Sequence, residues 1–158
     1  QEILLVTDEG REEEVITRLA RVGYDFTIGY LDGGFNTWKK AGKEVDRIPS
    51  VDAGELADRM RTGKVNILDV RKKSEYQSEH IVDAENAPLD LINESMAGID
   101  KNKTYYVHCA GGYRSMIFNS ILRARGFDNL VDVKSGFKAI KESGRFSISD
   151  YVCPSTLL

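Results

Sequence analysis

The sequence contains an internal repeat, and this repeat limits the folds open to the chain more than any other feature. Residues 3–45 resemble residues 104–146, with Asp8 facing Cys109 and two extra residues following in the second copy. The later matched pairs are Arg11 with Arg114, Leu19 with Leu122, Gly23 with Gly126, Gly34 with Gly136, and Gly42 with Gly144. We therefore expect the two copies to fold as the same unit.

Each copy has the pattern strand, tight loop, helix, turn, strand, short helix. In the second copy an apolar stripe at helical spacing runs from Ile117 to Leu122, and Gly126 is suited to end that helix. Residues 46–103 have no counterpart in the first copy. There the pattern predicts a linker at 46–50, a helix opened by the capping box Asp52–Glu55, a buried strand at 65–70, a brief helix from Ser74 and a short strand at 84–87.

Strands that alternate with helices predict an α/β fold with a mostly parallel sheet. Residues 51–158 are expected to form one complete domain, and residues 1–45 the carboxyl-terminal half of a second, truncated one. Because the chain begins with Gln1 and a buried strand follows at once, we expect it to be part of a longer protein with an upstream domain.

Charge and apolar runs exclude two classes of partner. The net charge is −3, and Lys and Arg form no stripe, so the electrostatic footprint for binding nucleic acid is missing. Apolar runs are far shorter than the ~20 residues that span a bilayer. We expect a cytoplasmic protein that binds neither nucleic acid nor membrane. Its two cysteines are too few for a disulfide framework or a cysteine-based zinc site.

The chemistry of the chain is expected at Cys109, which lies between a predicted strand and a predicted helix. Unpaired amides at a helix start favour an anion and lower the pKa of a thiol there. Gly111 and Gly112 let the backbone turn its amides inward, and Arg114 adds a permanent cation. The pattern predicts a nucleophilic thiolate in an anion cradle. A small buried apolar residue is the alternative interpretation, and we prefer that one for Cys153.

Several ordered motifs of residues 50–146 resemble the rhodanese homology family of sulfurtransferases. The motifs are Ile67–Arg71, Glu75-Tyr76, His80-Ile81, Asn86–Pro88, the loop Cys109–Arg114 and Ser135–Phe137. The resemblance implies a rhodanese-like α/β domain with about five strands, mostly parallel, and helices on both faces of the sheet. It also implies a persulfide on Cys109 and no cofactor or metal.

In the implied reaction, Cys109 takes sulfur from thiosulfate or a low-molecular-weight persulfide and gives it to a thiol, sulfite or cyanide. The residues expected to hold the persulfide are Ala110, Gly111, Gly112, Tyr113, Arg114 and Ser115. Arg114 has two open roles, orienting an anionic donor or fixing the loop through a salt bridge. Arg71 and Lys134 are expected near the rim, with a solvated surface charge as the preferred interpretation of each. Asp69 and His80 are expected to support the structure.

Two other functions are considered. A cysteine phosphatase has a His-Cys-x5-Arg loop, but only four residues separate Cys109 from Arg114, so we rank it lower. A regulatory module that relays or senses sulfur without turnover is the second alternative.

The first copy resembles a degenerate rhodanese module, because Asp8 cannot carry sulfane sulfur. The chain is similar to the carboxyl-terminal part of tandem rhodaneses, including those fused to a metallo-β-lactamase-fold persulfide dioxygenase. Its half-module leaves apolar residues uncovered, so we expect it to pack on the complete domain or to form a homodimer.

Overall fold

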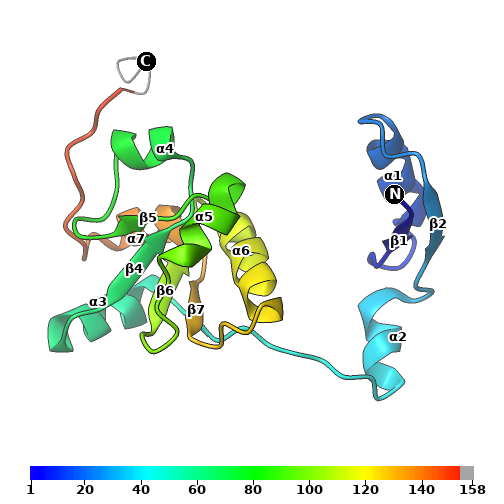
Figure 1. The fold of residues 1–158 in the computed structure, drawn as a ribbon, viewed down its shortest axis with the longest axis horizontal. Coiled ribbons are helices and arrows are strands. Elements are labelled where there is room, and N and C mark those ends of the chain that lie inside the picture. Colours follow the sequence, from blue (N-terminus) through cyan, green and yellow to red (C-terminus); the bar gives the residue numbers. More distant parts are fainter. Residues whose placement is uncertain (154–158) are drawn as a thin grey trace. The chain divides into compact units, whose positions relative to one another are not determined.

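The structure is a computed structural model that describes residues 1–153. It divides into two compact units, Gln1–Arg47 and the chain from Ile48 onward (Figure 1). The last part of the predicted domain 51–158, residues 154–158, lies outside the described residues. None of the helices that the structure describes is long and apolar enough to cross a membrane.

The second unit is built on a parallel sheet of five strands, which confirms the predicted fold. Their order across the sheet is β3-β7-β6-β4-β5, and every neighbouring pair is parallel. The strands are β3 (Ser50–Val51), β4 (Asn66–Asp69), β5 (Glu85–Asn86), β6 (Tyr105–His108) and β7 (Leu130–Val133). The central strand β6 is buried along its whole length. The residues that follow β6 are therefore attached to a buried strand that is paired on both sides, with β7 and with β4.

Helices cover both faces of this sheet, as expected. They are α3 (Ala53–Thr62), α4 (Lys73–Ser78), the short 3-10 helix η1 (Leu89–Leu91), α5 (Ile92–Ala97), α6 (Tyr113–Ala124) and α7 (Gly136–Ser143). On one face Phe118 and Leu122 of α6 are fully buried against the strands. On the other, Leu56 of α3 and Ile140 of α7 pack with Ile67 of β4. The domain thus has two apolar cores, one on each side of the sheet.

The predicted capping box at the start of α3 is confirmed. The Asp52 carboxylate accepts the Glu55 amide at 2.8 Å, and the Glu55 carboxylate accepts the Asp52 amide at 2.9 Å. These two bonds satisfy amides that the first turn of a helix leaves without partners.

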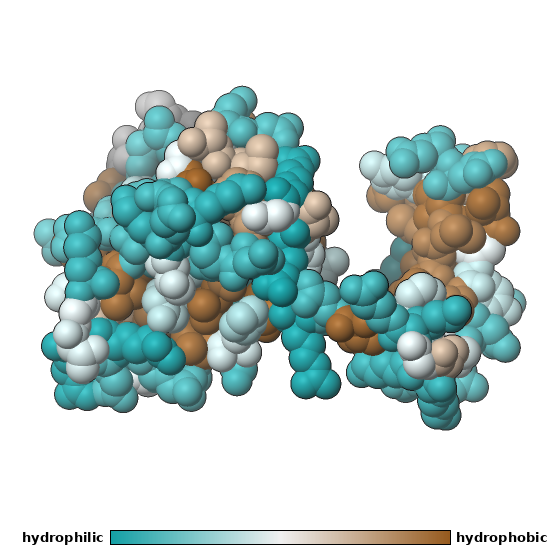
Figure 2. Space-filling model, turned by 60° about the horizontal axis from the view of Figure 1, so that its bottom comes forward, coloured by the Kyte–Doolittle hydropathy of each residue, from teal (hydrophilic) through white to brown (hydrophobic). Residues whose placement is uncertain are grey.

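The first unit holds one parallel pair of strands, β1 (Ile3–Leu5) and β2 (Thr27–Tyr30), with α1 (Glu12–Ala20) and α2 (Gly34–Lys40). Much of its apolar surface is exposed: Leu4 keeps 73% and Val6 61% of its accessible area, and Phe26 and Tyr30 are also exposed. Figure 2 shows apolar side chains gathered over this unit.

The strand registers correct the predicted alignment of the two loops. Leu5 pairs with Tyr30, four residues before Gly34, and Val107 pairs with Asp132, four residues before Gly136. A Cβ at Gly34 would meet the Thr7 carbonyl, and a Cβ at Gly136 the Cys109 carbonyl. Thr7, not Asp8, therefore occupies the position of Cys109.

The carboxyl ends of the matched helices α1 and α6 agree with the predicted alignment. Tyr24 donates its amide to the Leu19 carbonyl at 3.0 Å, and Phe127 donates its amide to Leu122 at 3.1 Å. With Thr7 opposite Cys109, the second loop is longer by one residue rather than two. A sequence alignment anchored on Gly and Arg residues does not detect this shift.

Candidate active site

Cys109 lies directly after β6, at the carboxyl end of the central strand. Helix α6 begins four residues later, and its cap Gly112 has a φ of +102°, which side chains with a Cβ rarely adopt. The chain therefore turns within three residues from a buried strand into a helix, and the amides of the turn face the sulfur.

The Cys109 sulfur is stabilised as an anion. Gly112 donates its amide to Sγ at 3.1 Å, and the side chain is 1% exposed. Burial raises the pKa of the thiol, but hydrogen bonds from Ser115, Gly112 and Gly111 more than offset it. The pKa of Cys109 therefore lies below its ordinary value. A lowered pKa increases the fraction of thiolate at a given pH, and the thiolate is the nucleophilic form of a cysteine.

The backbone of the loop is fastened to the start of α7. Phe137 donates its amide to the Cys109 carbonyl at 2.7 Å, and Lys138 donates to Ala110 at 3.1 Å. A Cβ on Gly136 would lie 2.3 Å from the Cys109 carbonyl, so only glycine permits this approach. Lys134 is exposed at the carboxyl end of β7, the strand beside β6.

The Arg114 guanidinium binds the Glu75 carboxylate of α4 through two hydrogen bonds, 2.6 and 2.9 Å long. The hydrogen bond from Arg114 lowers the pKa of Glu75. Of the two roles left open for Arg114, this geometry fits the one in which it fixes the loop. Sequence reasoning gave Glu75 no role in the site, although the residue belongs to a family motif.

Arg71 departs from the expected solvated surface charge, and that expectation is wrong. The side chain is only 6% exposed, and its Nε lies 2.9 Å from Oδ1 of the fully buried Asp69. Its guanidinium also stacks 4.0 Å from the Phe137 ring and donates to the Glu79 carbonyl. The carboxylate and the ring compensate the buried charge. The same Phe137 donates its amide to the Cys109 carbonyl, so it connects Arg71 to the loop.

His80 and Tyr113 lie in different environments. His80 Nδ1 lies 2.7 Å from the Tyr76 carbonyl, and the His80 ring stacks on the ring of Tyr76 at 3.9 Å. Tyr113 is 80% exposed at the start of α6, and Ala110 and Gly111 are exposed as well. The solvent side of the loop is therefore formed by small residues and one aromatic ring.

His108 immediately precedes the cysteine and is fully buried. Its Nε2 lies 3.9 Å from the Asp69 carboxylate and has no hydrogen-bond partner among the described residues. Burial lowers the pKa of His108. The ring stacks on Phe137 on the side of the sheet away from α6, whereas Cys109 belongs to the core on the α6 side.

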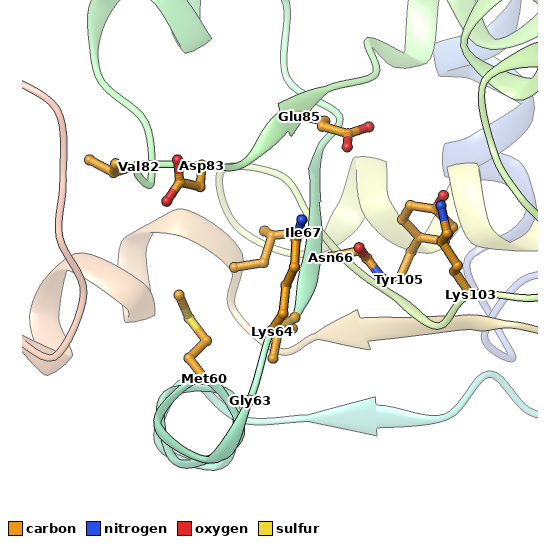
Figure 3. A pocket seen from close by; sticks show the side chains of 11 residues that line it. Met60, Gly63, Lys64, Asn66, Ile67, Val82, Asp83, Glu85, Lys103 and Tyr105 are labelled. Atoms are coloured by element: carbon orange, nitrogen blue, oxygen red, sulfur yellow. The ribbon is translucent and has the colours of Figure 1, made fainter.

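A cavity of about 640 Å³ lies at the other end of the sheet (Figure 3). Asn66 and Tyr105, which line it, begin β4 and β6, whereas Cys109 follows the end of β6. This cavity is therefore separate from the cysteine loop. No group of three or more His, Cys, Asp or Glu in residues 1–153 could hold a metal ion.

Comparison with known proteins identifies the family. The model of the rhodanese-like domain matches residues 52–143, so the chain belongs to the rhodanese-like domain family. A tRNA sulfurtransferase of Thermoplasma acidophilum is 38% identical over 85 residues, which are 51% of this chain and 17% of that protein. The first curated relatives are matched over 17 to 60% of their own lengths.

Solved structures share the fold. The rhodanese-like domain protein of Staphylococcus aureus is 34% identical, with a TM-score of 0.58 over 65% of this chain and all of that one. The thiosulfate sulfurtransferase of Pseudomonas aeruginosa is 24% identical, with a TM-score of 0.57, and covers 95% of this chain and 33% of that one. A match of this extent includes residues of the first unit as well as the second.

Proposed function

We propose that the chain is a sulfurtransferase that carries sulfane sulfur as a persulfide on Cys109. The observation that carries this proposal is the position of the sulfur: it receives the Gly112 amide at 3.1 Å at the start of a twelve-residue helix, and its pKa is lowered. Membership of the rhodanese-like family and the likeness to a tRNA sulfurtransferase support the same reaction.

The reaction proceeds in two displacements. The Cys109 thiolate attacks the outer sulfur of thiosulfate or of a low-molecular-weight persulfide, a new S–S bond forms, and the donor leaves as sulfite or as a thiolate. A thiol, sulfite or cyanide then attacks the outer sulfur on Cys109, and the cysteine leaves as the thiolate again. The amides of the loop hold the negative charge on sulfur in both states.

A phosphatase reaction is disfavoured by the same geometry. Four residues separate Cys109 from Arg114, and the guanidinium that would bind a phosphate is already bound at both nitrogens to Glu75. Aryl phosphates should therefore remain intact in the presence of the protein.

Intact-mass analysis after incubation with thiosulfate or glutathione persulfide tests the proposal. We expect the mass of one added sulfur on the wild type and on Cys153→Ser, and none on Cys109→Ser. Release of that sulfur to glutathione or cyanide over many cycles supports an enzyme, whereas a single release without turnover supports the relay alternative. Sulfur carried on Cys153 would overturn the proposal.

A further inference from the structure

An acidic residue, Asp132, interrupts the apolar strand β7, which lies beside β6 in the sheet. Asp132 is 4% exposed and pairs in register with Val107, two residues before Cys109. Neighbours in a parallel sheet point to the same face, and so do residues two apart along a strand. Asp132, Val107 and Cys109 therefore all face the layer that holds α6.

The side of α6 turned toward Asp132 carries two buried polar residues. Ser115 and Asn119 stand one helical turn apart and are 0% and 1% exposed. Neither amide atom of Asn119 nor Oδ1 of Asp132 has a hydrogen-bond partner among the described residues. Unsatisfied buried polar atoms are costly, and this group lies directly beneath the proposed sulfur site.

The Ser115 hydroxyl has one proton and three acceptors in reach. Its Oγ lies 3.1 Å from the Gly112 carbonyl. The Ser115 side chain is also close enough to Cys109 and to Asp132 to act on both as a hydrogen-bonding group, and it lowers the pKa of each. A single hydroxyl proton serves one of these acceptors at a time. Which acceptor receives the proton depends on the protonation state of Asp132.

We propose that Asp132 is a positioning residue for Cys109: as a neutral acid it donates to Ser115 Oγ and leaves the serine proton for the sulfur, and as a carboxylate it takes that proton. This inference rests on the proposed function, because it assumes that Cys109 is the reacting group. Burial raises the pKa of Asp132, which extends the pH range of the neutral form upward.

The other charged groups near this site are engaged elsewhere. On α6, Arg114 binds Glu75, and Arg123 lies 3.6 Å from Asp128. On the far side of Asp132, strand β3 places the uncharged Ser50 beside it. Among the groups that β3, β6 and α6 place on the side of Asp132, the ionisable side chains are therefore Cys109 and Tyr105, and the Tyr105 hydroxyl accepts the Asp100 amide at 3.2 Å.

The test is a pH titration of the Cys109 thiolate in the full chain, followed by its ultraviolet absorbance with the Cys109→Ser variant subtracted. We expect Asp132→Asn, whose amide donates permanently, to raise the thiolate-to-thiol ratio about tenfold at a pH below the midpoint, equivalent to about one pKa unit. Asp128→Asn, which removes an exposed acid of the same charge, is the matched control and should change the ratio less than twofold.

A double-mutant cycle separates the hydrogen bond from direct charge repulsion. In a Ser115→Ala background the effect of Asp132→Asn should fall to about threefold or less, because only the through-space part remains. An equal effect in both backgrounds, or none in either, would overturn the inference. The readout requires no sulfur transfer, so failure of the proposed function would be seen separately, as a normal titration without persulfide formation.

Discussion

The loops after β1 and β6 start from the same backbone arrangement and differ in the charge that follows. Thr7 and Cys109 both lie against a glycine at the start of a short helix, Gly34 and Gly136. The first turn of α1 then carries Glu12, Glu13 and Glu14, whereas the first turn of α6 carries no acid. In the first unit, carboxylates already occupy the positive end of the helix. In the second, that end is left for the sulfur.

The two loops also differ in the partner of their matched arginines. Arg11 binds Glu14 of its own helix at 2.9 Å, and Arg114 binds Glu75 of a separate helix at 2.6 Å. The first pair joins neighbours along one exposed helix, while the second ties α4 to the cysteine loop. The comparison teaches that a strand, a loop and a helix do not suffice for an anion site. A free helix end and a loop held from outside are also needed.

The largest expected effect separates the two matched positions. Cys109→Ser should reduce sulfur transfer on the order of a thousandfold or more, the scale of removing a covalent nucleophile. Thr7→Ser should leave the rate unchanged. Thr7→Cys should gain no sulfur on residue 7, because the three glutamates of α1 disfavour a second anion there. Sulfur loading at residue 7, read by peptide mass spectrometry, would break the comparison.

Core truncation should affect the two units very differently. Phe118→Ala removes a fully buried ring and should cost the second unit about 3–5 kcal/mol of unfolding free energy. Phe26→Ala removes a ring that is 58% exposed and should change the stability of the first unit by less than about 1 kcal/mol.

Denaturant titration of the full chain measures both of these changes. The single tryptophan, Trp38, lies in α2 and reports the first unit by fluorescence, while hydrogen exchange of the β6 amides reports the second. A large loss from Phe26→Ala would mean that its side chain is covered in solution.

The pH profile tests the thiolate. Because the pKa of Cys109 is lowered, persulfide formation should keep its full rate to a lower pH than the reaction of free glutathione with the same donor. Below the midpoint the rate should fall about tenfold per pH unit as the thiolate is protonated. A profile that coincides with that of glutathione would show that the loop does not stabilise the anion. Ser115→Ala should move the midpoint upward.

Removal of the acid from each arginine pair gives a smaller effect. Glu75→Gln should slow persulfide formation about threefold to tenfold, since Arg114 is partly buried and the loop loses its outside support. Glu14→Gln removes only a solvent-exposed ion pair, so it should leave the stability of the first unit and the rate nearly unchanged. Equal rates for wild type and Glu75→Gln would reduce that pair to a surface contact.

Deletion of residues 1–46 should have the smallest effect on the chemistry. Sulfur loading on Cys109 should stay within about twofold of the full chain, because every contact described around the sulfur comes from the second unit. Light scattering of both proteins should show less self-association after deletion, since the exposed Leu4 and Val6 are removed. A loss of loading would show that the first unit takes part in the site.

The sequence was sufficient to predict the layers of the fold and the location of the cysteine loop. These features depend on local signals, each of which shapes the backbone within a few residues of its own position. The signals are the alternation of strand and helix patterns, the capping box at Asp52 and the glycines near Cys109. The register between the two copies was not predictable in this way. Gly34 approaches the Thr7 carbonyl, and these residues are far apart in the sequence. Because the two loops differ in length by one residue, a sequence alignment does not show that Thr7 is the residue equivalent to Cys109.

Buried charges were the second limit. Arg71 has the composition of a surface residue, and only the folded chain brings Asp69 and Phe137 around its guanidinium. Asp132 did leave a signal, because it interrupts an apolar strand, Leu130–Val133. Such an interruption marks a polar site only when the facing helix is known, and the neighbours Ser115 and Asn119 follow from packing rather than from sequence spacing.

The strand order has a consequence for how the chain acquires its structure. The edge strand β3 pairs with β7, and Ser50 pairs with Asp132, which is about 80 residues later in the chain. Strand β3 therefore cannot join the sheet until a long loop has closed, and such closure is slow. The segment from β6 through α6 to β7 needs no such closure, and in the first unit the matching strands β1 and β2 likewise pair across a single helix, within residues 3–30. We expect residues 105–133 to form the folding nucleus, so that during synthesis the domain stays open until the ribosome has passed β7.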